Sequence, residues 1–412
     1  MTDEKQSLLT PVMRWFLFAM VLANVASNMY VMLLPVFLKE LGASVAQVGL
    51  VFTLSSLVPL ALQIFGGWIS DSIGRLRAIA IGSIGGVIGQ FMMVASPTWQ
   101  WMLVAISIAS IARAFVGPSF GAFIAEQSTE ITRGRVYGLS GTIFQVVSVI
   151  GPPLGGFIAF RYGFRIMLLV SAILYCIAAL IRIWMARTAR FKAEKKSKKL
   201  SIRTFRTQLG TMIGLILSGG LVTWIFITDG VGDIAWRLSD QLFPLYLNDQ
   251  IGLTVAQIGM LEAVFGIAMM TATLPAGWLS DKIGERITIM IGFFLVFLGF
   301  VFYLQSQDII GVGISWAVFG LGVGGLVPPY DSIVSKAVPE HMRGTAFGLF
   351  RTSLGVISLP SPWIGAQLWE RFNPKVPFQI TSISTLITIV IVWFKFKLPE
   401  NGKAVPEVEP AD

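Results

Sequence analysis

The chain has 412 residues, of which 55% are hydrophobic and only 13% are charged. A soluble protein of this length cannot bury so much apolar surface, so the composition excludes a soluble globular fold and favours a membrane protein. The net charge of +9 is interpreted as a signal of membrane topology and as an attraction to anionic membrane lipids. It does not indicate a nucleic-acid partner.

Continuous apolar segments, each long enough to cross a hydrocarbon core about 30 Å thick, recur along the whole chain. A membrane-spanning β-barrel would show short alternating segments instead. The sequence therefore predicts an all-α membrane protein with twelve transmembrane helices, six in each half. The predicted spans are residues 13–38, 44–66, 78–96, 100–124, 137–160, 163–185, 219–247, 254–276, 287–305, 309–335, 344–369 and 377–396.

The chain contains an internal duplication. Residues 45–49 return 210 residues later as residues 255–259, and residues 67–74 return at the same spacing as residues 277–284. Two related halves with polar positions near the middle of the membrane are typical of secondary transporters. The predicted parts are an N-terminal six-helix bundle at 1–185, a cytoplasmic linker with a membrane-proximal helix at 186–218, a C-terminal six-helix bundle at 219–398 and a cytoplasmic tail at 399–412.

The basic residues of the connecting loops fall mainly on one side of the predicted spans. The positive-inside rule places that side, with both termini, in the cytoplasm of a multi-pass cell-membrane protein. Residues 187–206 form the most basic stretch and are interpreted as a cytoplasmic linker. Residues 209–220 are apolar, and we expect them to form a helix at the membrane interface or to lengthen the seventh span.

The loop between the second and third spans carries a spaced set of glycines and charges. The glycines permit a tight turn, and a carboxylate beside them can lie at the positive end of a neighbouring helix. At this loop the chain resembles the major facilitator superfamily, in particular its drug/proton antiporter-like branch, and the resemblance covers nearly the whole length. It implies that the loop latches the two halves together in the outward-open state, the alternative being a purely structural helix connection. The residues are Gly67, Asp71, Gly74, Arg75 and Arg77.

The second copy of this loop is altered. It keeps Asp281 but has Glu285 at the position of Arg75, so the latching role is expected of the first copy. Glu126 lies at the inner end of the fourth span, where we expect it to pair with a basic residue of the cytoplasmic loops. The candidates are Arg75, Arg77 and Arg135.

Two further segments resemble motifs of the superfamily. Arg113 lies in the fourth span, where a charge costs ~3 kcal/mol or more unless it faces a cavity or a partner. We expect it to face a cavity, the alternative being a structural ion pair. The motif in the fifth span is associated with antiporters and combines a proline kink with glycines that permit close helix contact. A simple packing kink is the alternative for these residues, which are Gly151, Pro152, Gly155 and Gly156.

The seventh span contains four charged residues spaced so that they share one helical face. Against lipid they would cost about 10 kcal/mol in total, so we expect this face to contact protein or water. Asn24 and Asn28 of the first span lie at positions that correspond to the second and third charges. Two such polar stripes predict a central cavity between the halves, and mutual neutralisation of the charges is the alternative. The charged residues are Asp229, Asp233, Arg237 and Asp240.

Three other ionisable residues fall within predicted spans, namely Glu262, Asp331 and Arg351. Each is a candidate proton carrier or one member of an ion pair. A carboxylate next to a guanidinium exchanges protons when the pair separates, so Asp233 is the expected coupling residue. Asp229 and Glu262 are the rival carriers.

The sequence shows no phosphate-binding loop, no metal-ligand cluster and no catalytic triad. It contains one His and one Cys, so we expect no enzyme activity, no cofactor and no metal. The leading hypothesis is a monomeric, proton-coupled exporter of amphipathic organic molecules that works by alternating access. One alternative is an importer or uniporter of a small polar metabolite, and the other is a membrane receptor that transports nothing.

Overall fold

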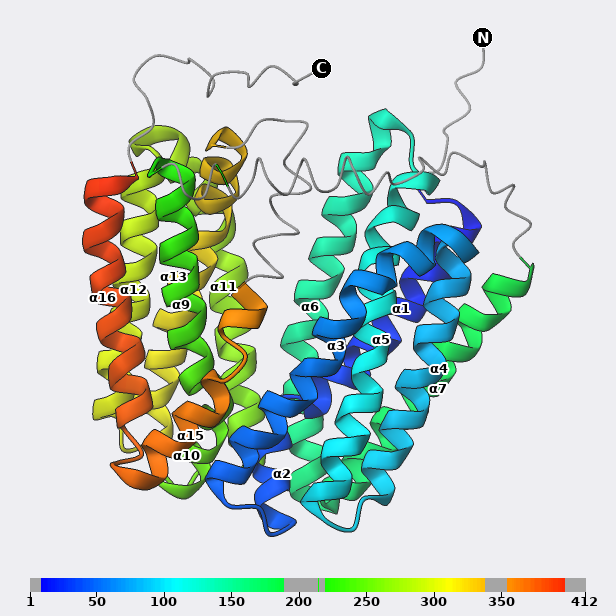
Figure 1. Cartoon of the computed structure of the whole chain (residues 1–412), viewed down its shortest axis with the longest axis horizontal. Coiled ribbons are helices and arrows are strands. Elements are labelled where there is room, and N and C mark those ends of the chain that lie inside the picture. Colours follow the sequence, from blue (N-terminus) through cyan, green and yellow to red (C-terminus); the bar gives the residue numbers. More distant parts are fainter. Residues whose placement is uncertain (1–8, 189–213, 215–218, 338–353, 397–412) are drawn as a thin grey trace. The chain divides into compact units, whose positions relative to one another are not determined.

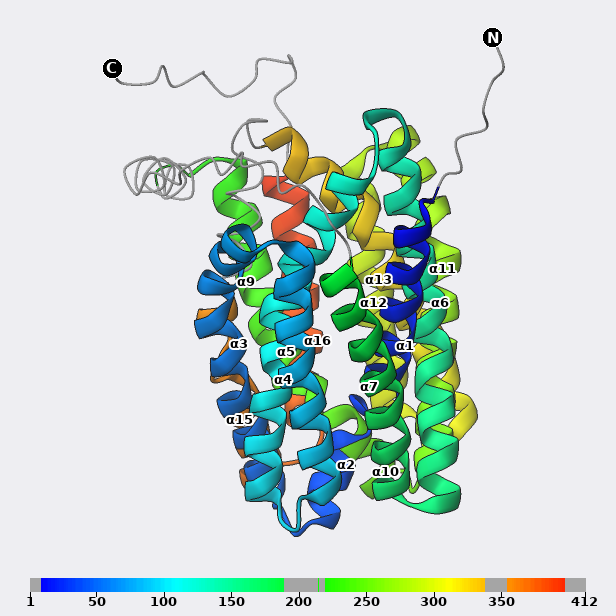
Figure 2. The ribbon, with the colours of Figure 1, turned by 90° about the vertical axis from the view of Figure 1, so that its right-hand side faces the viewer.

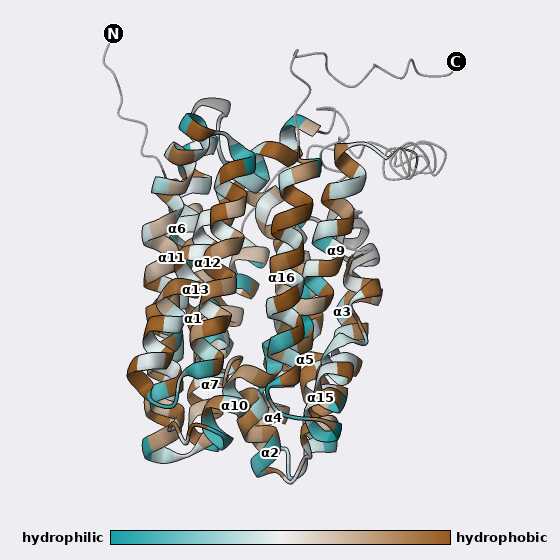
Figure 3. Cartoon of the chain, turned by 90° about the vertical axis from the view of Figure 1, so that its left-hand side faces the viewer, coloured by the Kyte–Doolittle hydropathy of each residue, from teal (hydrophilic) through white to brown (hydrophobic). Residues whose placement is uncertain are grey.

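The structure is a computed structural model that describes residues 9–188, 214, 219–337 and 354–396. Within these ranges every regular element is a helix, and most of the helices are long (Figure 1). Ten of the described helices are long and apolar enough to cross a membrane. Hydrophobic residues line most of the length of α16 (Val376–Lys395), as expected for a helix in contact with lipid (Figure 3).

The chain forms two compact units. Unit 1 consists of Met1–Ser197 and Gln241–Ala263, and unit 2 consists of Lys198–Asp240 and Val264–Asp412. The first half of the sequence therefore packs together with a short segment of the second half. The domain boundaries derived from the repeat stay a prediction.

Unit 1 is a bundle of long helices that lie side by side in both views (Figures 1 and 2). In unit 1, α1 packs against α6 and α7, and α4 packs against α5 and α7. The helices are α1 (Pro11–Tyr30), α2 (Leu34–Glu40), α3 (Val45–Ile73), α4 (Arg75–Ala95), α5 (Trp99–Gln127), α6 (Glu130–Tyr162), α7 (Phe164–Thr188), α10 (Phe243–Asp249) and the start of α11 (Val255–Ile283).

Unit 2 repeats part of this packing, with α16 in contact with α9 and α12, and α12 in contact with α13. Its elements are α9 (Leu221–Ser239), the remainder of α11, α12 (Glu285–Gln305), α13 (Ile309–Ala337), α15 (Ser361–Arg371) and α16. The predicted helix at 209–220 lies almost entirely outside the described residues, and so does the first part of the predicted span at 344–369.

Two predicted spans are each interrupted by a turn. The span predicted at 13–38 forms α1 and α2, and the span predicted at 219–247 forms α9, the 3-10 turn Asp240–Leu242 and α10. Pro35 and Pro244 lie in the first turn of α2 and α10, where a missing N–H is harmless and the fixed φ suits the helix. The expectation of one continuous helix at each place is corrected to a long helix followed by a short one.

The short helices α2 and α10 pack against each other within unit 1. Five successive residues of each helix are buried, from Leu34 to Leu38 and from Phe243 to Leu247. An ion pair between Lys39 and Asp249 joins their C-terminal ends. These contacts explain why the segment from Gln241 onward belongs to unit 1 rather than to unit 2.

The same hydrogen bond holds the first and last long helices of both sequence halves together. Ser171 on α7 donates to the Ala26 carbonyl of α1 at 2.8 Å. The corresponding residue of the second half, Thr381 on α16, donates to the Ala235 carbonyl of α9 at 2.6 Å. Because both bonds end on a backbone carbonyl, they fix the spacing of the two helices whatever side chains lie nearby.

Candidate functional site

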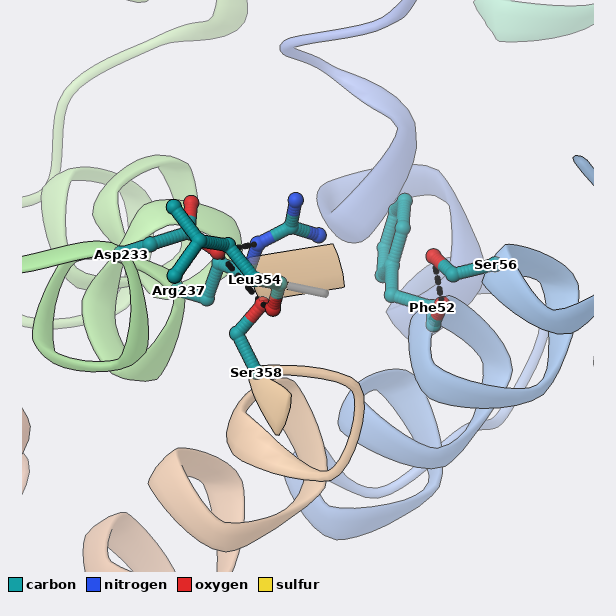
Figure 4. Close-up of polar contacts among 6 residues, drawn as sticks. All are labelled: Phe52, Ser56, Asp233, Arg237, Leu354 and Ser358. Atoms are coloured by element: carbon teal, nitrogen blue, oxygen red, sulfur yellow. Dashed lines mark hydrogen bonds and ion pairs between the residues drawn. The ribbon is translucent and has the colours of Figure 1, made fainter. Parts of the chain in front are cut away.

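The charged face of α9 contains an ion pair with a third polar partner (Figure 4). The Asp233 Oδ2 atom accepts from the Nε of Arg237 at 2.9 Å and from the Oγ of Ser358 at 2.5 Å. The carboxylate and the guanidinium are 30% and 36% exposed, respectively, whereas Ser358 is fully buried. The i,i+4 spacing brings the two charges together, and a residue from distant sequence completes the site.

The other two charges of this stripe have different surroundings. Asp229, one turn before Asp233, is half-buried and forms a side-chain hydrogen bond with Tyr330 of α13. The Tyr330 hydroxyl also lies 3.3 Å from the Oγ1 of Thr228. Asp240 caps the C-terminal end of α9, where its backbone N–H still bonds the Trp236 carbonyl, and begins the 3-10 turn. Its place on the predicted helical face stays a prediction.

Asn24 and Asn28 lie on α1 in unit 1, and each side-chain amide donates to a backbone carbonyl one turn earlier. The Asn24 Nδ2 donates to the Met20 carbonyl, and the Asn28 Nδ2 donates to the Asn24 carbonyl, both at 2.8 Å. Each amide keeps a second N–H and a carbonyl oxygen for other partners. The central cavity expected between the two polar stripes stays a prediction.

Arg113 is an exposed residue of α5. Its Nη2 donates to the Ser110 Oγ at 2.7 Å. Among the residues that the structure describes, no carboxylate forms an ion pair with it. Its cavity-facing role stays a prediction.

An ion pair connects the start of α4 with the end of α5. The Arg75 Nε lies 3.1 Å from the Glu126 Oε1, so Arg75 is the partner among the three considered from the sequence. Arg77 is exposed, and the side chains of Gly67 and Asp71 lie outside the described part of the chain. The latching role of this loop stays a prediction.

The corresponding place in the second half carries the same ion pair with its charges exchanged. Glu285, at the position of Arg75, pairs with Lys336, at the position of Glu126. Ser332 also donates to the Glu285 carboxylate, at 2.9 Å, and Asp281 is exposed. Gly74 and Gly284 precede these pairs with φ of 93° and 88°, which only glycine adopts easily.

The motif in α6 is a site of close helix contact. A Cβ at Gly151 would lie 2.5 Å from the Asn28 Cβ, and one at Gly155 would overlap the Met29 carbonyl of α1. On another face of α6, a Cβ at Gly156 would lie 2.6 Å from the Val255 carbonyl of α11. Pro152 lies inside the helix without ending it. The glycines let α1 and α11 approach the α6 backbone.

The remaining predicted ionisable residues are dispersed. Glu262 is half-buried in α11, Asp331 is exposed in α13, and Arg351 lies outside the described residues. Within the described ranges, no group of three or more His, Cys, Asp or Glu side chains is placed to hold a metal ion.

One buried cation escaped the sequence-based prediction. Arg182 on α7 is 2% exposed, and its Nη1 and Nη2 lie 2.8 Å from the Ser83 Oγ and the Met20 Sδ. Its guanidinium carbon lies 5.8 Å from the centre of the Tyr175 ring, and its Nε has no partner among the described residues. The signal in the sequence was a single arginine within the apolar run of the sixth span, close enough to the span's end to be taken for part of the basic flank.

Comparisons with known proteins identify the family of this chain. The sequence profile of the Major Facilitator Superfamily matches residues 16–228 and 226–411. An uncharacterized MFS-type transporter of Methanocaldococcus jannaschii is 24% identical over 383 residues, covering 92% of this chain and 93% of the relative. A multi-drug resistance efflux pump PmrA homolog of Lactococcus lactis subsp. lactis is 24% identical, with 91% and 92% covered.

The fold agrees with these matches. The crystal structure of the nucleoside transporter NupG superimposes with a TM-score of 0.75 at 15% identity, covering 95% of this chain and 100% of that one. The expected all-α fold of two related halves is therefore confirmed, as is the resemblance inferred from the loop motif. The chain belongs to the Major Facilitator Superfamily and is a multi-pass membrane transporter.

Proposed function

We propose that the protein is a proton-coupled exporter of amphipathic organic molecules, acting by alternating access in the cell membrane with both termini in the cytoplasm. The observation that carries the proposal is the Asp233 carboxylate, held between Arg237 and Ser358 on a helix of the seventh span. Its side chain is 30% exposed, so a proton has access to the carboxylate, while Arg237 and Ser358 hold the carboxylate in place. A relative named as a multi-drug resistance efflux pump supports export.

The ion pair provides a physical basis for coupling. With Asp233 ionised, the two charges neutralise each other at a depth where one isolated charge costs about 2.5–3.5 kcal/mol. A proton on Asp233 leaves the Arg237 guanidinium without its carboxylate, so the protonated site is stable only when another group or water solvates the cation. Protonation of Asp233 thereby favours a different arrangement of unit 2.

The rival acids are weaker candidates for structural reasons. Asp229 is hydrogen-bonded to Tyr330 and has no cation beside it among its described partners. Its protonation would therefore leave no positive charge without a partner. Glu262 lies on α11 in the segment assigned to unit 1. Asp233 is therefore the acid whose charge state has the largest consequence.

The inner loop of the first half is proposed as the gate. Arg75 ties α4 to α5 through Glu126, which holds the end of the loop carrying Asp71 in a fixed position. Replacing Asp71 by Asn is then expected to slow transport while changing ligand affinity by less than about tenfold, or ~1.4 kcal/mol. The labelling rate of cytoplasmic-side cysteine probes is the measurement that reports gating.

A second candidate function is import or facilitated diffusion of a small polar metabolite. The exposed Arg113 and the spare amide groups of Asn24 and Asn28 offer hydrogen bonds suited to a polar solute. The structural neighbour NupG is a nucleoside transporter. A uniporter of this kind would move its solute down the solute's own gradient without a proton.

The deciding experiment measures uptake of the amphipathic dye ethidium into inside-out proteoliposomes with and without an imposed pH gradient. Asp233→Asn is expected to abolish gradient-driven accumulation while sparing downhill exchange. Asp308→Asn is the matched control, because Asp308 is exposed and its Oδ1 only caps α13 through Gly311, a role that asparagine also fills. Transport that ignores the pH gradient would favour the uniporter, and no movement of any solute would favour the receptor.

A further inference from the structure

Ser358 lies at a break in the predicted eleventh span. Residues 354–357 are helical, residues 358–360 form a turn, and α15 begins at Ser361. The Ser358 hydroxyl has two oxygen neighbours at short distance, the Asp233 Oδ2 at 2.5 Å and the Leu354 carbonyl at 2.6 Å (Figure 4). The residue is fully buried, so water does not replace either contact.

Counting hydrogens shows that these two contacts compete. A serine hydroxyl has one hydrogen to donate. When Asp233 is ionised, the carboxylate and the carbonyl are both acceptors, so the hydroxyl donates to only one of them at a time. The Leu354 carbonyl already accepts from the Ser358 backbone N–H at 2.9 Å, and a bond to a charged acceptor is the stronger one. The ionised carboxylate therefore takes the hydroxyl.

A proton on Asp233 reverses this preference. The Ser358 hydroxyl then donates to the Leu354 carbonyl one turn back, a common arrangement for serine in helices, while the neutral carboxyl donates its own O–H to the Ser358 oxygen. The contact between Asp233 and Ser358 changes from a charge-assisted hydrogen bond to a weaker neutral one. No buried donor is left unsatisfied in either state. The break is thus bonded strongly to α9 when Asp233 is ionised and more weakly when Asp233 is protonated.

We propose that Ser358 is a positioning residue that transmits the charge state of Asp233 to the break in the eleventh span. The ionised carboxylate holds residues 354–358 against α9, and protonation weakens this hold. This inference rests on the proposed role of Asp233 in proton coupling. It adds a defined element of unit 2 that moves in response to the proton.

The packing around the site favours movement at this contact. A Cβ at Gly230 of α9 would lie 3.3 Å from the Leu354 Cδ2, so the break rests on an α9 surface with no side chain in the way. By contrast, α16 is bonded to α9 through Thr381, whose hydroxyl contacts the Ala235 carbonyl and the Ser239 hydroxyl. The bond between the break and α9 therefore depends on a titratable group, whereas the bonds between α16 and α9 do not.

The charged and titratable groups near Asp233 come from two elements. Arg237 and Asp229 flank it on α9, and Tyr330 of α13 is hydrogen-bonded to Asp229. Through its hydrogen bond with Asp229, Tyr330 is tied to α9 independently of the break. The hydrogen bond between Arg237 and Asp233 does not involve Ser358. Replacing Ser358 therefore tests the contact with the break while leaving the ion pair in place.

The test follows a cysteine at the break without requiring transport. Val356 is 58% exposed, so Val356→Cys in a Cys176→Ser background can be labelled with a maleimide over a series of pH values. The rate, corrected for thiol ionisation with a free-cysteine standard, is expected to show a step that Asp233→Asn removes. Ser358→Ala should remove the step as well, because the break then has no hydrogen bond to the carboxyl group.

Two paired variants separate the hydroxyl from the packing. Ser358→Thr keeps a hydroxyl and should keep the wild-type step, whereas Ser358→Val has the same shape without it and should behave as the alanine variant. Ser384→Ala is the control, because it deletes a buried hydroxyl of unit 2 that has no partner among the described residues. It should leave the step unchanged.

Two outcomes distinguish a failure of this inference from a failure of the proposed function. If Asp233→Asn abolishes proton-driven transport but Ser358→Ala and Ser358→Val keep the wild-type labelling step, Ser358 has no transmitting role. If Asp233→Asn leaves both the step and proton-driven transport intact, the coupling proposal itself is wrong.

Discussion

The interface of α1, α4 and α7 in unit 1 and that of α9, α12 and α16 in unit 2 descend from one duplicated sequence, yet their side chains differ. Unit 1 buries Ser83, Gln90 and Arg182 at this interface. At the 210-residue spacing the second half has aromatic or aliphatic residues instead. The corresponding residues are Phe293, Phe300 and Val392.

The contacts that the halves share mostly involve backbone. Gly155 lets the Met29 carbonyl approach α6, and Gly365 of α15 accommodates the Leu238 carbonyl of α9 in the same way. Ser171 and Thr381 both donate to a backbone carbonyl. Backbone contacts of this kind constrain only the size of a few residues, so the rest of each interface was free to change. The comparison teaches that shared contacts specify the fold and that unshared polar residues indicate function.

One charge in each half, Arg182 and Asp229, illustrates the second part of this lesson. Arg182 lies against Met20 of α1 in unit 1. Equivalent contacts of α1 and α9 lie 209 residues apart, as the carbonyls of Ala26 and Ala235 do. In unit 2, the position of Met20 is therefore taken by Asp229, and that of Arg182 is taken by Val392 at the 210-residue spacing. Each half therefore keeps one charge at this contact, opposite in sign and on the opposite helix. Neither charge is needed for the fold, since the other half forms the same helix pair without it.

The largest expected effect comes from the shared glycines. Gly155→Ala and Gly365→Ala each force a methyl group into a backbone carbonyl that cannot move independently, so both should destabilise the protein by about 3 kcal/mol or more. Thermal unfolding of the purified variants in detergent measures this. Gly141→Ala is the control on α6, because nothing lies within 4 Å of its Cβ position. Equal losses of stability are expected for the two variants. A variant with unchanged stability would show that the glycine contact is not equally important in the two halves.

Arg182→Met tests the unshared charge and should separate stability from activity. Replacement of a buried charge by an apolar residue of similar length is often neutral or stabilising by about 1–4 kcal/mol. The Ser83 hydroxyl keeps its bond to the Ile79 carbonyl at 2.7 Å, so no donor is stranded. We expect thermal stability to be unchanged or higher and transport to fall at least about tenfold, ~1.4 kcal/mol in a rate. Strong destabilisation with normal transport per folded molecule would make Arg182 a structural residue.

The sequence anticipated features that arise from local spacing. The Asp233–Arg237 pair follows from i,i+4 spacing, and the turn at Gly74 follows from the loop motif. Ser358 could not be anticipated, because it joins the site from 125 residues away and carries no periodic signal. The place where α9 ends and the 3-10 turn at Asp240 begins could not be anticipated either, because a pattern of charges does not define that position. Arg182 could have been identified from the free-energy cost of a charge within the apolar sixth span, but it lies close to the basic stretch at 187–206 and was overlooked.

Exchanging the charges of one inner ion pair gives a smaller effect. Arg75→Glu places two carboxylates together beside the loop, and adding Glu126→Lys recreates the arrangement of Glu285 and Lys336 in the second half. Such partly exposed pairs contribute about 0–1 kcal/mol to stability. The single variant should therefore reduce the transport rate more than the melting temperature, and the double variant should restore it. A double variant as slow as the single one would show that the two pairs are not equivalent.

The smallest effect is expected at Glu40, the counterpart of Asp249 at the end of the short helix. Asp249 pairs with Lys39, whereas partial burial raises the pKa of Glu40 above its usual range. A raised pKa means that the folded state binds the proton more tightly than the unfolded state, so Glu40 lowers stability as pH rises through that range. Glu40→Gln should raise the melting temperature at pH 7 by at most about one degree and leave it unchanged at pH 4. Because the residue is largely solvated, a gain of several degrees would mean that Glu40 has an unfavourable contact beyond its own burial.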